Sequence, residues 1–311
     1  MKISEALSKF LLGRRADGIA PSTVEWYRKR LARFIEFFND CEFITITIDD
    51  LRRFVVSLQE QNVKWANHKF HHPTAGNLSP STIHGYVRIV KTFYNWLEQN
   101  DYITTAQNVA IRLKKPKLPK QAPKEILEMD MISLIEAAKS YGRYSKRNYA
   151  MILFLADTGC RVGGLASLRL ADLDLSRGQA MVIEKGSKSR IVFFGQETKD
   201  ALTAWLAERP QDIDTGFLFV SERGRLTTYG VRMVLKRLKK IAGVGGFVNP
   251  HSFRHAFAKR AINHGISDSS LANLMGHTNI KTTHDAYLIY RTQELQDAHR
   301  RYSSLGGHLK K

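Results

Sequence analysis

Four short segments of this 311-residue chain carry side chains that could act on a phosphodiester. They are Thr158-Gly159-Cys160-Arg161, Lys185, His251-Ser252-Phe253-Arg254, and Gly276-His277 followed by Tyr287. A phosphodiester under in-line attack gains negative charge on its non-bridging oxygens, and a guanidinium group can offer two parallel donors to such oxygens. Each segment alone is weak evidence, because such pairs can arise by chance among 48 Lys plus Arg and 11 His.

The order and spacing of these segments resemble the tyrosine recombinase (phage integrase) family. Thr158-Gly159-Cys160-Arg161-Val162-Gly163-Gly164-Leu165 is similar to the family's first box, and its arginine is Arg161. Lys185 is similar to the first lysine of the family's Lys-Gly-x-Lys-x-Arg hairpin. His251 and Arg254 match the second box.

The resemblance implies that Tyr287 is the nucleophile, ten residues after the His277 of a Leu-x-Gly-His segment. A tyrosine hydroxyl has an ordinary pKa near 10, so it needs a cationic pocket or a base, and it would hold DNA as a 3′-phosphotyrosyl ester. Because the ester retains the energy of the broken bond, rejoining needs neither ATP nor a metal, and we expect no cofactor. Tyr290, one helical turn further on, stays an alternative nucleophile.

The resemblance also implies roles for the other site residues. Arg161 and Arg254 would bind the phosphate, and Lys185 would protonate the departing sugar hydroxyl, with Lys188 as its rival. His251 would act as the base or as an oxyanion donor. His277 would donate a further hydrogen bond to the phosphate.

The chain departs from the family pattern at three positions. The family usually has an acidic residue three positions after the first arginine, where this chain has Gly164, and that carboxylate would help to orient the cationic pocket. After the tyrosine, Leu288 and Ile289 replace the usual polar residue and histidine. Gly164 therefore supports an alternative hypothesis, a catalytically silent DNA-binding relative.

The function that the resemblance implies is site-specific DNA recombination by a two-domain, Xer-like enzyme acting as a tetramer on double-stranded DNA. Residues 292–303 are the candidate helix for docking on a neighbouring protomer. A topoisomerase of type IB remains a third hypothesis, because it uses similar Arg, Lys, His and Tyr chemistry.

Composition points to the same class of partner. The formal net charge is +19 and the pI is near 9.9, which favours nucleic acid as the partner and an anionic membrane surface as the second choice. No stretch approaches about 18 apolar residues and the first residues lack a signal-peptide pattern, so we expect a cytoplasmic, nucleoid-associated protein without a membrane span.

Cysteine and histidine patterns give no support for a metal site. Cys41 and Cys160 are far apart and form no CxxC motif, so we expect reduced thiols. His68, His71 and His72 have no neighbouring carboxylate or cysteine, so we expect a polar loop there.

The domain boundary is expected at residues 108–124, which carry three prolines and five lysines and therefore favour an extended basic linker. We expect a helical, SAM-like core-binding domain over 1–107 and a catalytic domain over 125–311. The fold class is mainly α with a small antiparallel sheet (α+β).

Two N-terminal helices are expected to start at the similar segments Pro21-Ser22-Thr23-Val24 and Pro80-Ser81-Thr82-Ile83, the first with a capping box from Ser22 to Glu25. Apolar residues recur at helical spacing in both, from Tyr27 to Phe38 and from Tyr86 to Leu97. Their basic faces and the linker are candidates for DNA contact, namely Arg28, Lys29, Arg33, Arg88, Lys91, Lys114, Lys115, Lys117 and Lys120. The alternative is that these charges are merely solvated.

Further elements follow from periodicity and turn residues. A short helix near the N-terminus and a helix over 48–61 complete the first domain. In the second, a helix is expected over 148–157, and short strands over 180–184 and 190–194 flank a hairpin. Later helices are expected over 198–208, 228–242, 252–264, 268–275, 280–290 and 292–303.

Overall fold

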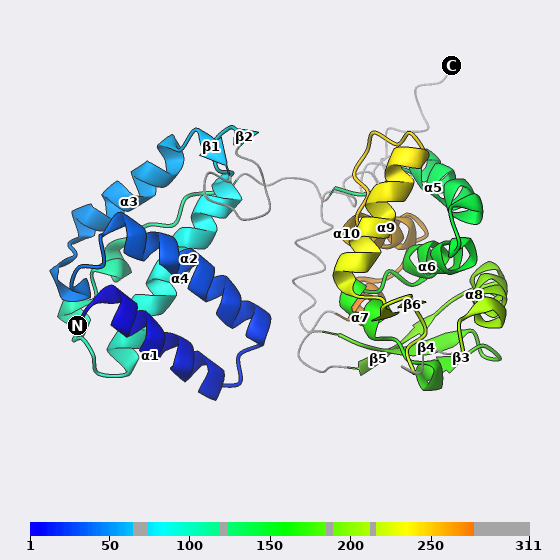
Figure 1. Ribbon diagram of the computed structural model, residues 1–311, viewed down its shortest axis with the longest axis horizontal. Coiled ribbons are helices and arrows are strands. Elements are labelled where there is room, and N and C mark those ends of the chain that lie inside the picture. Colours follow the sequence, from blue (N-terminus) through cyan, green and yellow to red (C-terminus); the bar gives the residue numbers. More distant parts are fainter. Residues whose placement is uncertain (65–73, 119–123, 185–188, 212–215, 277–311) are drawn as a thin grey trace, which may run out of the picture. The chain divides into compact units, whose positions relative to one another are not determined.

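The computed structural model divides into two compact units, residues Met1–Lys120 and Gln121–Lys311 (Figure 1). The structure describes residues 1–64, 74–118, 124–184, 189–211 and 216–276. Each unit has its own hydrophobic core. The division falls inside the segment that the sequence predicts as a linker.

The described residues of the N-terminal unit form four α-helices, with short 3-10 turns between and after them. The helices are α1 (Ile3–Ala16), α2 (Pro21–Phe37), α3 (Ile48–Glu60) and α4 (Pro80–Gln99). The expected apolar stripes face the core, because Leu31, Phe34, Val90, Phe93 and Leu97 are buried. Gly13 lets α1 approach α4, since a Cβ at this position would lie 2.7 Å from the Trp96 ring.

Three details of the N-terminal prediction are wrong. The capping box from Ser22 to Glu25 is absent, because α2 begins at Pro21 and its N-cap Ala20 has no side-chain acceptor. The unit is not wholly helical, since β1 (Val63–Lys64) and β2 (Thr74–Ala75) form a short antiparallel pair. The linker is shorter than expected, because the 3-10 helix η3 (Val109–Arg112) packs on α4 and Leu113 is buried.

The C-terminal unit is organised around helix α6 (Ser145–Thr158), which is buried on nearly all sides. Helices α5 (Glu128–Ser140), α8 (Gln196–Glu208) and α10 (Pro250–Asn263) pack against it. The remaining described helices are α7 (Val162–Ser167), α9 (Thr228–Ile241) and α11 (Asp268–Met275). The all-round burial follows from the sequence, since seven consecutive residues from Ala150 to Ala156 are apolar.

The sheet of this unit has the strand order β3-β4-β5 and is antiparallel throughout. Strands β4 (Gln179–Ile183) and β5 (Ser189–Phe193) confirm the expected hairpin, and they are joined by β3 (Leu173–Asp174) at one edge. A separate small pair consists of β6 (Val220–Ser221) and β7 (Gly224–Arg225). Ala180 and Val182 point into the core, as alternation along β4 requires.

The C-terminal helices expected over 198–208, 228–242, 252–264 and 268–275 are all confirmed by α8, α9, α10 and α11. Helices α5 and α7 were not anticipated. The helices expected over 280–290 and 292–303, and the three histidines near residue 70, lie outside the described residues.

Cys160 is buried and Cys41 is half-buried, and both are free thiols. Burial raises the pKa of the Cys160 thiol, which keeps it protonated at neutral pH. None of the described helices combines the length and the apolar character that a membrane crossing requires.

Candidate functional site

Arg161 is positioned by the tight turn between α6 and α7. Gly159 ends α6 in the left-handed region at φ +56°, and a Cβ there would lie 2.6 Å from the Phe257 ring, so only glycine fits. The Thr158 hydroxyl then accepts a hydrogen bond from the Cys160 amide at 3.2 Å. Arg161 follows as the N-cap residue of α7, with its side chain about one third exposed.

Helix α10 brings His251 and Arg254 to the same turn. Its N-cap Asn249 accepts hydrogen bonds from the amides of His251 and Ser252 at 2.9 and 3.1 Å, and Pro250 occupies the first turn. Arg254 is only 3% exposed, and its guanidinium donates to the carbonyl oxygens of Gly159 (2.7 Å) and Met275. These two contacts fix the plane of the guanidinium at the base of the site.

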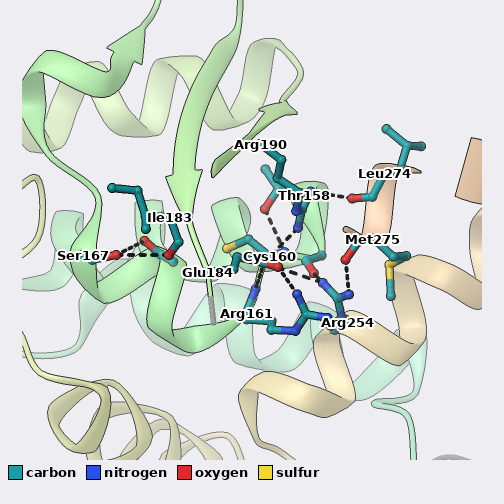
Figure 2. Close-up of polar contacts among 12 residues, drawn as sticks. Thr158, Cys160, Arg161, Ser167, Ile183, Glu184, Arg190, Arg254, Leu274 and Met275 are labelled. Carbon is teal, nitrogen blue, oxygen red and sulfur yellow. Dashed lines mark hydrogen bonds and ion pairs between the residues drawn. The ribbon is translucent and has the colours of Figure 1, made fainter. Parts of the chain in front are cut away.

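A buried carboxylate, Glu184, joins the two arginines (Figure 2). Its side chain is 4% exposed; it pairs with the Arg161 guanidinium and lies 4.0 Å from that of Arg254. It also accepts a hydrogen bond from the Arg161 backbone amide at 3.1 Å. Glu184 is not among the residues predicted from the sequence. Alternation along the strand could have identified it, because Glu184 stands two positions after the core-facing Val182 and faces the core as well.

Arg190 is a third arginine in this cluster. It lies on β5, donates to Glu184 at 3.1 Å and also donates to the carbonyl oxygen of Leu274 near the end of α11 (Figure 2). Desolvation lowers the pKa of its guanidinium, which nevertheless stays charged because arginine starts so far above neutral pH. Arg190 therefore ties the hairpin to the end of α11.

All of these charged side chains except Arg190 line a pocket of about 360 Å³. Its wall includes Arg161, Glu184, His251 and Arg254, together with the two glycines Gly163 and Gly164. Three guanidinium groups around one carboxylate leave an excess of two positive charges. The pocket can therefore accept a phosphate group, whose oxygens match the fork geometry of arginine.

His251 is held in a state suited to proton transfer. Partial desolvation of the ring lowers its pKa from 6.5, and the positive charges of Arg254, Arg161 and Arg232 lower it further. Desolvation also lowers the pKa of the neighbouring His255. The centres of the two imidazole rings lie 6.3 Å apart. At neutral pH the His251 imidazole is therefore mainly neutral and can accept a proton.

The structure thus brings together three of the six sequence-predicted catalytic residues, Arg161, His251 and Arg254. Lys185, His277 and Tyr287 lie outside the described residues, as do the rivals Lys188 and Tyr290. Two of these undescribed residues, Lys185 and His277, directly follow described residues that lie at or near the pocket. Glu184 precedes Lys185, and Gly276 precedes His277 at a position where a Cβ would lie 3.2 Å from Glu184 Oε2.

The described residues contain no cluster of three or more His, Cys, Asp or Glu side chains that could hold a metal ion. The pocket wall itself carries one carboxylate and one histidine among its nine residues. A pocket of this composition suits an anion better than a cation.

The basic residues of the N-terminal unit form an aromatic and cationic surface on α2 and α4. Arg30 stacks on Tyr86 with its guanidinium carbon 4.3 Å from the ring centre, and Arg88 lies 5.2 Å from the centre of the Trp26 ring. Among the predicted DNA-contact residues, Arg28 and Lys29 pair with Glu25, and Arg33 lies near Tyr86. Lys114, Lys115 and Lys117 are exposed, and Lys120 lies outside the described residues.

Lys91, one of the predicted DNA-contact residues, has a structural role in the N-terminal unit. Its ammonium donates to the carbonyl oxygens of Ala110, Ile111 and Leu113 at 2.9, 2.8 and 3.0 Å. An ammonium has three protons, so these bonds use all of them. Lys91 fastens η3 to α4, and the periodicity of α4 could not reveal acceptors some 20 positions away.

Comparison with protein families gives two matches that cover most of the chain. Residues 124–294 match the Phage integrase family, and residues 7–104 match the Phage integrase N-terminal SAM-like domain. Tyrosine recombinase XerC of Oceanobacillus iheyensis is 30% identical over 274 residues, covering 85% of this chain and 84% of the relative. Tyrosine recombinase XerD of the same organism is 27% identical, covering 92% and 93%.

Solved structures share the fold. The crystal structure of XerA recombinase is 28% identical, with a TM-score of 0.52 and coverage of 96% of this chain and 98% of that chain. The Tn1549 transposon integrase in complex with transposon right-end DNA has a TM-score of 0.69 at 20% identity and covers 96% and 99%. A lambda integrase dimer bound to a core site has a TM-score of 0.70 at 17% identity, with 94% and 95% covered.

The electrostatic environment of His251 predicts the effect of a distant charge. Arg232→Gln removes one of the three cations that lower the His251 pKa, so that pKa should rise toward 6.5. A titration of the histidine ring signals by NMR measures the shift. His255 is the internal control, since Arg232 is not among the causes of its lowered pKa. An unchanged His251 pKa would contradict the inference that the charge of Arg232 lowers it.

Proposed function

This chain belongs to the phage integrase family and is a tyrosine recombinase, and on that premise we propose how its own residues cut and rejoin DNA. The single observation that supports the proposal is the pocket in which Arg161 and Arg254 converge beside a mainly neutral His251. One scissile phosphate of double-stranded DNA occupies this pocket. The two guanidiniums bind its non-bridging oxygens and stabilise the charge of the transition state.

The nucleophile is Tyr287. Its hydroxyl oxygen attacks the phosphorus, the bond to the 5′ oxygen breaks, and a 3′-phosphotyrosyl ester forms. The tyrosine proton passes to one ring nitrogen of the neutral His251 imidazole, and the other ring nitrogen can donate a hydrogen bond to the phosphate. The reverse reaction with the 5′ hydroxyl of another strand releases the tyrosine and completes the exchange.

Lys185 is the general acid, and it protonates the 5′ oxygen as that oxygen leaves. Its position in the sequence supports this role, because Glu184, the residue before it, is part of the arginine cluster. His277 follows Gly276, which adjoins Glu184 and Arg190, and donates a further hydrogen bond to the phosphate.

Binding to DNA rests on phosphate contacts from both units. The net charge of +19 and the exposed Arg88, Lys114, Lys115 and Lys117 support this proposal. The Tn1549 and lambda integrases that share the fold are described as DNA complexes. Affinity of this kind falls steeply with salt, and a protein that binds DNA in this way is expected at the nucleoid.

We place the recombination reaction in a tetramer on two DNA sites. Strand exchange needs two cleaved partners held together, and residues 292–303 are the candidate segment for docking on a neighbouring protomer. The lambda integrase that shares this fold is described as a dimer bound to its core site. This supports the proposal that the protein assembles on DNA to react.

Two tyrosine variants test the proposed nucleophile. With a nicked suicide duplex that carries the cognate site, Tyr287→Phe should form no detectable covalent adduct, because no other hydroxyl replaces the attacking oxygen. Tyr290→Phe is the matched control and should form adducts within about tenfold of the unmodified chain. The measurement is the denaturing-gel shift of labelled DNA. Adducts with the first variant and none with the second would reverse the assignment.

A modified substrate tests the proposed acid. Lys185→Ala should slow cleavage of ordinary DNA by about 10²–10⁴-fold, the usual contribution of a general acid. With sulfur in place of the bridging 5′ oxygen, the leaving group needs no proton, so the variant should recover to within about tenfold of the unmodified chain. Lys188→Ala serves as the control. No recovery with the sulfur substrate would exclude Lys185 as the proton donor.

Variants at two residues of α4, Arg88 and Lys91, distinguish a role in DNA binding from a role in the stability of the fold. Arg88→Gln should reduce the slope of log K against log salt by about 0.9 for the loss of one phosphate contact, and leave the urea midpoint unchanged. Lys91→Met should leave the slope unchanged and lower the free energy of unfolding by about 1 kcal/mol, because it deprives three carbonyl oxygens of their donor. The opposite pattern would contradict the structural role of Lys91.

A further inference from the structure

Gly164 and Glu184 occupy complementary positions. Gly164 lies in the first turn of α7, three residues after the N-cap Arg161. A Cβ built on it would lie 3.2 Å from the Val182 Cβ and 3.7 Å from the Glu184 Cγ. A longer side chain at position 164 would therefore enter the space that the Glu184 side chain fills.

The backbone contact of Glu184 is equally specific. A glutamate three residues after an N-cap residue ordinarily turns back and accepts a hydrogen bond from the N-cap amide, as in a capping box. At the start of α7 that amide belongs to Arg161, and it donates instead to Glu184 Oε1 at 3.1 Å. Glu184, the residue that follows β4, thus makes the contact that an acidic residue at position 164 would make within the helix.

We propose that Glu184 is a positioning residue that takes the place of the acidic residue missing at position 164, and that it holds Arg161 in register with the scissile phosphate. The inference rests on the proposed function, because its consequence is the rate of DNA cleavage. It implies that Gly164 marks a relocated carboxylate and not a silent site.

The surroundings of Glu184 give the physical reason. Arg161, Arg190 and Arg254 all lie within 4.0 Å of its carboxylate, and three close guanidiniums would repel one another without it. The Glu184 and Arg254 side chains are each 4% exposed, so water screens little of this interaction. Removing the negative charge should therefore displace the most exposed arginine, which is Arg161 at 32%.

The position of Glu184 also links three parts of the site. Through Arg190 it is joined to the end of α11, and its Oε2 lies beside Gly276. In sequence it is the neighbour of Lys185. A single carboxylate can therefore set Arg161 and both chain segments that lead to Lys185 and His277.

The first experiment removes the charge and keeps the shape. For Glu184→Gln, single-turnover cleavage of the suicide duplex at saturating DNA should slow by about 100-fold, the cost of a misplacement near 1 Å. Its DNA affinity should stay within about threefold, because most phosphate contacts lie elsewhere. General destabilisation of the fold would lower both the cleavage rate and the DNA affinity, so a loss of rate alone is not expected from it. Cleavage at the unmodified rate would overturn the inference.

The second experiment removes the Glu184 carboxylate and places a new one at position 164 on α7. Glu184→Ala opens space next to position 164, and Gly164→Glu/Glu184→Ala should cleave at least tenfold faster than Glu184→Ala alone. Gly163→Glu/Glu184→Ala is the matched control, because a Cβ at Gly163 meets no atom within 4 Å and so, unlike one at Gly164, does not contact the Glu184 side chain. Rescue by position 164 and not by 163 supports the inference, and equal or absent rescue overturns it.

A third measurement does not depend on cleavage. Amide hydrogen exchange of Arg161 in the DNA-free protein should be faster in Glu184→Ala and slower again in the Gly164→Glu double variant. If Glu184→Ala does not fold, recovery of folded protein by the 164 substitution and not by the 163 substitution supports the inference, and recovery by neither overturns it. If the unmodified chain forms no adduct, the proposed function fails, and Arg161 exchange still decides the role of Glu184.

Discussion

The candidate site depends on one electrostatic constraint: several guanidiniums are held close together. The pocket that we propose for a phosphate must keep them so before the phosphate arrives. Like charges at such distances repel strongly when water is excluded, and Arg254 is almost completely buried. Glu184 offsets this repulsion while leaving an excess of two positive charges among the four side chains. The same carboxylate orients the donors, because each arginine must present a particular edge to it.

The fold serves this constraint by bringing distant segments to one point. Arg161 follows α6, Glu184 and Arg190 flank the β4–β5 turn, and Arg254 lies on α10, so nearly 100 residues of chain separate the members of the cluster. Backbone carbonyls complete it, since Arg254 binds Gly159 and Met275 while Arg190 binds Leu274. The buried helix α6 and the capped start of α10 are the rigid supports of this arrangement.

The sequence predicted much of this architecture, and the failures have physical causes. Arg161, His251 and Arg254 were identified because their motifs are local, and the strands and helices around them follow from periodicity and from turn residues. Glu184 was missed because its partner Arg161 lies 23 positions away, and an isolated glutamate looks like surface charge. Lys91 was assigned to DNA for the same reason, since its three acceptors are distant in sequence. The capping box at Ser22 failed because the helix already begins at Pro21, which makes Ala20 and not Ser22 the N-cap residue.

Moving a carboxylate from a helix to the hairpin changes what it controls. At position 164 it would orient Arg161 through a contact within α7, and the hairpin would be held by its backbone ladder and its own packing. Glu184 directly follows β4 and stands one residue before Lys185, so the arginine proposed to bind the phosphate and the lysine proposed to protonate the leaving group share a support. Ser167 adds to this link, because its hydroxyl donates to the Gly163 carbonyl oxygen at 2.9 Å and lies 3.5 Å from that of Ile183. We therefore expect a displacement of the hairpin to move Arg161, and we expect phosphate binding at Arg161, as proposed, to affect the residues at the base of the hairpin.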